Sequence, residues 1–360
     1  MKVNPDIFFK FHGDKFIVWN YRAHEQFELT LPYVKRLYEI GTGSSPEVPQ
    51  VAAPEFAQID RELADAGVVS GSYTAAYWGW DTLSHIFHFG TNSTPSGPTL
   101  SREDGTAAYI EYCEAIGADA PVVIPARTGE VFELPPPDLE KLKRTSLWDA
   151  LLARRTTREF TGEPIDLAVV SDILHATFGA VHGPDRSDVD VYGIRSYGYR
   201  RTSPAGGGLQ TAEPYLVNFT ISGLPTGIYH YHSIDHKLTR IEGEFPAGDL
   251  GPLLAGQNFA NDLGFAIFMV ARFDKMWWKY PHSRSYRVAL MDVGHLSQTF
   301  HLACTAYGLK SWLTAAFYDE EIAQRLRIDP TREAVMLMVG AGTGDGRPIN
   351  QAILDVLRAR

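Results

Sequence analysis

The chain has 360 residues, of which 44% are hydrophobic, and its 33 Lys and Arg against 43 Asp and Glu give a formal net charge of −10. This length fits two modest domains, and the apolar content excludes a disordered chain. The acidic balance argues against a nucleic-acid-binding protein, which normally presents a basic face. Two cysteines exclude a disulfide framework, the N-terminus lacks the apolar core of a signal peptide, and the longest apolar run is too short to span a bilayer. We therefore expect a soluble, globular, cytoplasmic protein.

The N-terminal third predicts a small module of its own. Residues 7–31 alternate between apolar and polar types around a turn at residues 12–14, which predicts a β-hairpin. Apolar residues at helical spacing predict one helix over residues 33–40 and another over residues 56–66, each ended by glycine. The order hairpin, helix, helix resembles a winged-helix or peptide-clamp module. An ordinary α+β cap on the main domain explains the pattern equally well.

The stretch over residues 133–144, ELPPPDLEKLKR, marks the expected domain boundary. Three consecutive prolines neither donate to a β-ladder nor fit inside a helix, so the chain should be extended there. We therefore expect an accessory domain over residues 1–135 and a main domain over residues 136–360.

The main domain mixes strands and helices without a regular βαβ order, which predicts an α+β fold with a mixed sheet flanked by helices. The pattern predicts helices over residues 147–155, 167–178, 287–307 and 319–326, strands over residues 215–221, 265–273 and 334–339, and a hairpin over residues 227–241. The helix over residues 287–307 is apolar on more than one face. Because such a helix is buried in a core or in a subunit interface, we expect a homodimer.

The sequence RRTTREF over residues 154–160 carries the strongest local signal for a binding site. Arg154, Arg155 and Arg158 offer guanidinium groups and Thr156 offers a hydroxyl, which are the donors that a phosphate group needs. A solvated basic helix end explains the same cluster without any ligand.

In chain order, five segments of this sequence resemble motifs of one family. RRTTREF is followed by RTSPAGGGLQTAEPYLV, GIYHYHSIDHKL, WWKYPHSRSYRVALMDVGHLSQTFHLACTAYGL and LTAAFYDEE. Together they resemble the FMN-dependent nitroreductase superfamily, and within it the SagB-type dehydrogenases that oxidise azolines to azoles in ribosomally made peptides. The resemblance covers roughly residues 77–350 and implies a nitroreductase-like FMN fold.

The resemblance also implies roles for individual residues. FMN would be bound by residues of the arginine cluster, of the glycine-rich loop and of three later segments: Arg154, Arg155, Thr156, Arg158, Pro204, Ala205, Gly206, Gly207, Gln298, Thr314, Ala315, Ala316 and Arg347. The backbone amides of Ala315 and Ala316 would face flavin N5. The glycine-rich loop would reach a flavin of the partner subunit, since flavins in this superfamily lie at the dimer interface.

Lys279 and Tyr280 match the Lys-Tyr pair that is regarded as catalytic in azoline dehydrogenases. A base at this position suits the reaction, because a partly desolvated lysine can remove a proton while hydride leaves for the flavin. Without the family context, Trp277 to Tyr280 would be read as an exposed loop packed for stability. The sequence departs from the family at Ala205, where a serine is usual, and at Ala315 and Ala316, where two glycines are usual.

These observations lead to three candidate functions. The first is an FMN-dependent dehydrogenase of a modified peptide, acting beside a cyclodehydratase or another maturation enzyme, with O2 or another acceptor reoxidising the flavin. The second is an NAD(P)H-dependent reductase of a small electrophile, and the third is a non-catalytic peptide-binding scaffold. We expect no metal site, because His230, His232 and His236 lack the further ligands that a metal needs.

Overall fold

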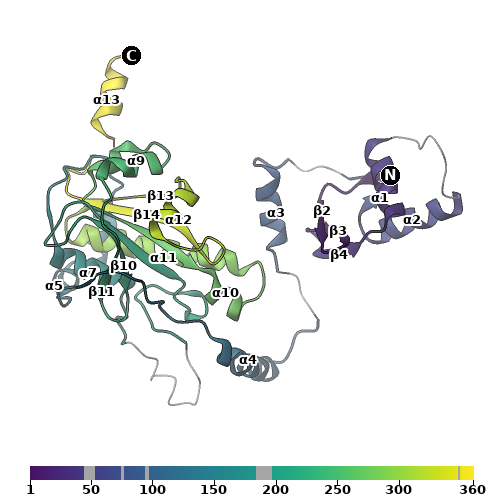
Figure 1. Cartoon of the computed structure of the whole chain (residues 1–360), viewed down its shortest axis with the longest axis horizontal. Coiled ribbons are helices and arrows are strands. Elements are labelled where there is room, and N and C mark those ends of the chain that lie inside the picture. Colours follow the sequence, from purple (N-terminus) through teal and green to yellow (C-terminus); the bar gives the residue numbers. More distant parts are fainter. Residues whose placement is uncertain (44–52, 74–76, 94–96, 184–196, 348) are drawn as a thin grey trace. The chain divides into compact units, whose positions relative to one another are not determined.

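The computed structural model describes residues 1–43, 53–73, 77–93, 97–183, 197–347 and 349–360 (Figure 1). The chain divides into two compact units, residues 1–99 and residues 100–360. Within the described residues, no helix combines the length and the apolar character needed to cross a membrane.

The first unit is a small α+β module with its own apolar core. Its elements are β1 (Lys2–Val3), β2 (Ile7–His12), β3 (Lys15–Asn20), β4 (Glu25–Glu28), α1 (Leu31–Thr42), α2 (Ala53–Asp65), β5 (Val69–Ser70) and α3 (Thr82–Gly90). Strands β2, β3 and β4 form an antiparallel sheet, and β1 pairs with β5. Val18 of β3, Leu37 of α1 and Leu63 of α2 lie in the shared core.

The structure confirms both helices that were expected in this unit and extends the expected hairpin. Residues 7–28 form three strands rather than two, because the chain turns a second time at His24, which has a φ of 60°. Helix α1 ends at Gly43 in the left-handed conformation that glycine favours. The winged-helix or peptide-clamp assignment stays a prediction.

The second unit is built on a seven-stranded sheet in the order β13-β14-β12-β8-β10-β11-β6, whose neighbours run antiparallel. Its strands are β6 (Val131–Glu133), β8 (Ala212–Asn218), β10 (Gly227–His232), β11 (Lys237–Glu242), β12 (Phe265–Arg272), β13 (Lys310–Thr314) and β14 (Glu333–Gly342). Parallel pairing occurs between β7 (Ile165–Asp166) and β9 (Ile221–Ser222) and at the bridge between Thr156 and Ser311. The expected strands and the expected hairpin are confirmed.

The helices of this unit are α4 (Arg102–Ile116), α5 (Glu140–Arg144), α6 (Leu147–Ala153), α7 (Leu167–Phe178), α9 (Leu250–Leu253), α10 (Phe273–Lys279), α11 (Ser285–Ala306), α12 (Asp319–Leu326) and α13 (Gln351–Arg358). Short 3-10 turns lie at Gly117–Asp119, Gly206–Gly208, Ala247–Asp249 and Asn258–Asp262. The helices expected over residues 147–155, 167–178, 287–307 and 319–326 are therefore confirmed, with α6 ending at Ala153.

Both faces of the large sheet are buried, because successive side chains of a strand point to opposite faces. Leu216 and Ile267 lie in a core with side chains of α7 and α11. Val217 and Phe268 lie in a second core with side chains of α9 and α12. The first core fixes α11 against one face of the sheet, and the α+β fold class is confirmed.

The boundary between the units lies before the triple proline rather than at residues 135 and 136. The Pro135 carbonyl accepts a hydrogen bond from Ser171 Oγ at 2.6 Å, and the Asp138 amide donates to Asp172 at 2.9 Å. Strand β6 also pairs with β11. Residues 100–135 consequently pack with the second unit, since the extended prolines run along α7 instead of linking two domains.

Candidate active site

The arginine segment, residues 154–158, follows α6 as extended chain beside β13. Thr156 pairs with Ser311, and the Thr157 amide donates to the Ser311 carbonyl at 3.2 Å. Arg154 and Arg155 have no carboxylate partner among the described residues. The positive charges of Arg154 and Arg155 are therefore not neutralised by an ion pair with a carboxylate in the described part of the chain.

His301 on α11 lies close to the arginine segment. Its Nδ1 atom lies 2.7 Å from Ser311 Oγ, and its buried Nε2 atom has no hydrogen-bond partner. Burial and the nearby charge of Arg154 lower the pKa of His301 to about 4. The imidazole is therefore neutral at physiological pH.

Arg347 lies beside the same segment through its backbone. Its carbonyl accepts from the Arg158 amide at 3.4 Å. Its guanidinium is bonded to Asp345 at 2.5 Å and to Gln351 at 3.2 Å. A phosphate contact from Arg347 would have to compete with Asp345.

The glycine loop, residues 204–208, is held by α11. Asp292 accepts a hydrogen bond from the Gly206 amide at 3.0 Å and another from the Thr211 hydroxyl at 3.3 Å. Gly207 has a φ of 61°, a left-handed conformation that favours glycine. Pro204 and Gly207 are exposed, whereas Ala205 and Gly206 are half-buried.

Lys279 and Tyr280 end α10 directly against this loop. Lys279 Nζ donates to the Gly207 carbonyl at 3.2 Å. A Cβ atom at Gly207 would lie 2.5 Å from the Tyr280 hydroxyl. The structure thus brings together the two parts of the sequence that were expected to supply the catalytic pair and the flavin-facing loop, although about 70 residues separate them.

The turn after β13 is partly closed by its own hydrogen bonds. The Ala316 amide donates to Thr314 Oγ1 at 3.0 Å, and Gln257 Nε2 donates to the Thr314 hydroxyl at 3.0 Å. Ala315 and Ala316 are exposed, as is Gln298 on α11. Of the two amides expected to face flavin N5, the Ala316 amide therefore already has an acceptor.

Within one chain, two groups of candidate residues, the glycine loop with Lys279 and Tyr280 and the arginine segment, lie at different points of α11. Asp292 marks the group with the glycine loop, and His301 marks the group with the arginine segment. Nine residues of helix separate them by about 14 Å at 1.5 Å per residue. The structure brings together the residues of each group, but not the two groups with each other.

Buried charges that the sequence analysis did not single out support the end of the glycine loop. Lys275 is fully buried, and its Nζ atom donates to the Gln210 carbonyl at 3.1 Å. Burial lowers the pKa of Lys275 to about 8. Glu213 lies 3.7 Å from Lys275 Nζ and accepts from Arg272 at 3.0 Å.

Glu213 remains ionised in this environment. Burial opposes its ionisation, but the His230 hydrogen bond and the charges of Lys275 and Arg272 outweigh this effect and hold its pKa well below the usual range. His230 Nε2 lies 3.1 Å from a Glu213 oxygen. The sequence signal that could have found them is three charged residues in otherwise apolar segments: Glu213 in β8, Arg272 in β12 and Lys275 in α10.

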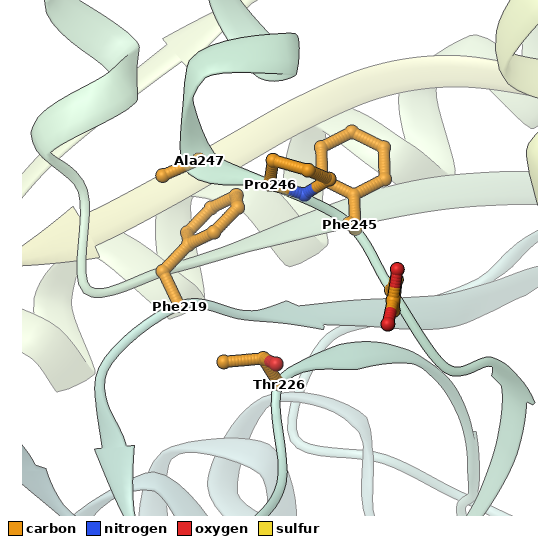
Figure 2. A pocket seen from close by; sticks show the side chains of 6 residues that line it. Phe219, Thr226, Phe245, Pro246 and Ala247 are labelled. Carbon is orange, nitrogen blue, oxygen red and sulfur yellow. The ribbon is translucent and has the colours of Figure 1, made fainter.

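A separate hollow of about 310 Å³ lies near the start of β10, lined by Phe219, Thr226, Glu244, Phe245, Pro246 and Ala247 (Figure 2). Two phenyl rings and a proline form its wall, with Thr226 at its edge (Figure 2). None of the expected site residues lines it. Within the described part of the chain, no group of three or more His, Cys, Asp or Glu side chains is arranged to hold a metal ion.

The profile of the nitroreductase family matches residues 151–343, which include every candidate site residue except Arg347. The chain belongs to the nitroreductase family. Membership places it among oxidoreductases and confirms the fold expected from the five motifs.

Known relatives of this nitroreductase-family chain fall into two kinds. A protein of Methanocaldococcus jannaschii, provisionally named a nitroreductase, is 29% identical over 59% of this chain and 98% of its own length. The trifolitoxin operon protein TfxC of Rhizobium leguminosarum bv. trifolii is 26% identical over 60% of each chain. The microcin B17-processing protein McbC of Escherichia coli is 28% identical over 39% of this chain and 53% of its own length. The chain therefore spans little more than half the length of TfxC and McbC, and these relatives confirm the resemblance to the SagB-type branch.

Among solved structures, a chain of the Escherichia coli microcin synthetase McbBCD complex with truncated pro-MccB17 is similar over 90% of this chain and 99% of its own length, with a TM-score of 0.44 and 19% sequence identity.

Proposed function

We propose that the protein is an FMN-dependent dehydrogenase that oxidises an azoline, or a related two-electron donor, in a modified ribosomal peptide. The observation that carries the proposal is the contact of Lys279 and Tyr280 with Gly207, in a chain of the nitroreductase family. The names of TfxC and McbC support a peptide as the substrate class.

The arginine segment fits the phosphate of FMN. Arg154 and Arg155, which have no carboxylate partner among the described residues, repel one another, and a bound phosphate would relieve that repulsion. Arg154, Arg155, Thr156 and Arg158 would hold the phosphate end, and the exposed turn at Ala315 and Ala316 would approach the ring. When bound, FMN accepts hydride at N5 and passes the electrons to O2 or another acceptor.

Lys279 is the proposed base. It ends a helix that is anchored by the buried Lys275 and Met276, and its Nζ atom is directed at the glycine loop. In the proposed reaction Lys279 takes the proton of the carbon–hydrogen bond that becomes part of the new double bond, and Tyr280 orients the substrate or donates to developing charge.

A homodimer would bring the two groups of candidate residues together. Exposed apolar side chains occur on α6, α11 and α13: Leu147, Trp148, Leu151, Leu290, Met291, Ile353, Val356 and Leu357. Such apolar surface is typical of an interface. We infer that the glycine loop of one protomer meets the arginine segment of its partner there.

The first test replaces the proposed base. Lys279→Ala should lower kcat for peptide oxidation at least about 100-fold while FMN content is retained, because the proton acceptor is gone. Lys143→Ala, which removes an exposed lysine that pairs with Glu140, is the matched control. Full turnover in the flavin-loaded Lys279→Ala protein would contradict the assignment.

A second test separates the dehydrogenase from its rivals. Under anaerobic conditions, NADPH should leave the visible band of the bound flavin unchanged. Prompt bleaching by NADPH would favour a reductase. A colourless protein that FMN does not reconstitute would favour a non-catalytic scaffold.

A further inference from the structure

Helix α4 is hydrogen-bonded to the end of α10, where Lys279 and Tyr280, the candidate pair, lie. The Tyr112 hydroxyl donates to the Lys279 carbonyl at 2.9 Å. In the opposite direction, Trp278 Nε1 donates to the Ile116 carbonyl at 2.9 Å. Two bonds to successive residues of α10 fix the helix at this point, so α4 is part of the surroundings of the candidate pair.

Tyr109 is the residue of α4 that faces both members of the pair. Its hydroxyl and that of Tyr280 share a hydrogen bond. Lys279 Nζ lies 5.8 Å from the centre of the Tyr109 ring and equally far from the Tyr280 ring, within the range of a cation–π interaction. Tyr109 consequently contacts the Tyr280 phenol through its hydroxyl and the Lys279 side chain through its ring.

The sequence of α4 presents these groups on one face. Tyr109, Tyr112 and Cys113 are spaced at i, i+3 and i+4, which places them side by side on a helix. Tyr109 also interacts with Cys113. The helix lies outside residues 151–343, the part of the chain that the family profile matches. Its contribution is therefore additional to the family domain.

We propose that Tyr109 is a positioning residue for the proposed dehydrogenase reaction. Its hydroxyl fixes the orientation of the Tyr280 phenol, and its ring fixes the Lys279 side chain, so that both meet the peptide in one geometry. The inference rests on the proposed function of the pair. It adds a residue of helix α4 to a site that otherwise comes from residues 151–343.

The groups that face Tyr280 determine how the contact can be measured. They are Lys279 on the same element, Tyr109 and Cys113 on α4, and His282, whose ring centre lies 6.2 Å away. Burial raises the pKa of Tyr280, Lys279 opposes the rise, and Tyr109 adds to it. Removing the Tyr109 hydroxyl should therefore lower the pKa of Tyr280.

The test compares Tyr109→Phe with Tyr112→Phe in the full-length, FMN-loaded protein. Both remove one hydroxyl from the same helix, but Tyr112 donates to a backbone carbonyl and does not bond to Tyr280. The pKa of Tyr280 is followed by NMR of ring-labelled tyrosine, with Tyr280→Phe identifying its signal. Tyr109→Phe should lower this pKa and reduce kcat about tenfold with KM unchanged, whereas Tyr112→Phe should leave the pKa of Tyr280 unchanged.

An unchanged Tyr280 titration in Tyr109→Phe, or wild-type kcat in that variant, would overturn the proposal. If Tyr109→Phe does not fold, the reciprocal variant decides: Tyr280→Phe should raise the pKa of Tyr109, because the hydrogen bond from Tyr280 lowers it. If Tyr109→Phe shifts the pKa of Tyr280 but the wild-type protein oxidises no peptide, the contact between the two tyrosines stands and the dehydrogenase assignment is refuted. Failure of the contact and failure of the proposed function therefore give different results.

Discussion

Gly207 illustrates how one residue links the glycine loop to Lys279 and Tyr280. Any other residue would be strained at its φ of 61°, and a side chain would meet the Tyr280 hydroxyl. Gly207→Ala should destabilise the protein by about 1–2 kcal/mol through the left-handed backbone. It should also lower kcat at least about tenfold by displacing Tyr280.

Gly223→Ala is the matched control for this change. Gly223 has a φ of 79°, but no atom lies within 4 Å of the position that a Cβ would occupy, so the same backbone strain arises without a contact at the site. Both variants should lose comparable stability in urea unfolding. Equal kcat in the two variants would show that the position of Tyr280 against Gly207 does not affect catalysis.

His301 should make the protein sensitive to acid. Its pKa is lowered to about 4 in the fold by burial and by Arg154, from an ordinary value of 6.5. As the pH falls, His301 is protonated in the unfolded chain at a higher pH than in the folded protein. The neutral, buried imidazole therefore contributes stability that is present above pH 6.5 and is lost as the pH falls toward 4. The loss in this window should reach up to about 3 kcal/mol.

Urea unfolding at several pH values measures this effect, with His301→Gln as the comparison. The variant should lose less stability between pH 6.5 and pH 4 than the wild type. His175, His232 and His236, whose pKa values burial also lowers, contribute to the slope that remains, as do carboxyl groups with shifted pKa values such as Glu213 and Asp292. Identical slopes in the two proteins would contradict a neutral, buried His301.

At the scale of elements, the arginine segment is where we expect the phosphate of FMN to bind. Arg154→Ala should weaken FMN binding about 10- to 100-fold, because a charge-assisted hydrogen bond to the phosphate is lost. Arg144→Ala, at an exposed site one helix earlier, should bind FMN as the wild type does. Fluorescence quenching of free FMN measures both, and equal affinities would exclude Arg154 from the phosphate site.

The sequence predicted the elements whose signals are local. A short apolar run predicted β12 and apolar residues on a long helix predicted α11, and the family resemblance implied that residues 204–208 and 279–280 belong to one site. The packing of α4 escaped prediction, because Tyr112 and Lys279 are 167 residues apart and nothing local marks their contact. The triple proline misplaced the boundary for the same reason: its partners, Ser171 and the sheet, are remote in sequence.

At the scale of the whole molecule, the proposed dimer depends on the apolar surface of α11. Met291 is 54% exposed on this helix. Met291→Glu should shift the protein from dimer to monomer in light scattering and lower its FMN content, because a buried carboxylate without a partner opposes association. Val122→Glu, at another exposed apolar position, should stay dimeric. A wild-type monomer with full FMN content would contradict the dimer.

The central claim is that electrons enter the flavin from a modified peptide and that Lys279 takes the accompanying proton. The most direct measurement mixes the FMN-loaded protein anaerobically with an azoline-containing peptide and follows the visible flavin band in a single turnover. The account predicts that the peptide bleaches the wild-type flavin and yields the azole, and that Lys279→Ala binds FMN but bleaches at least about 100-fold more slowly. A wild-type flavin that stays oxidised with every azoline peptide, yet is bleached by NADPH, would contradict it.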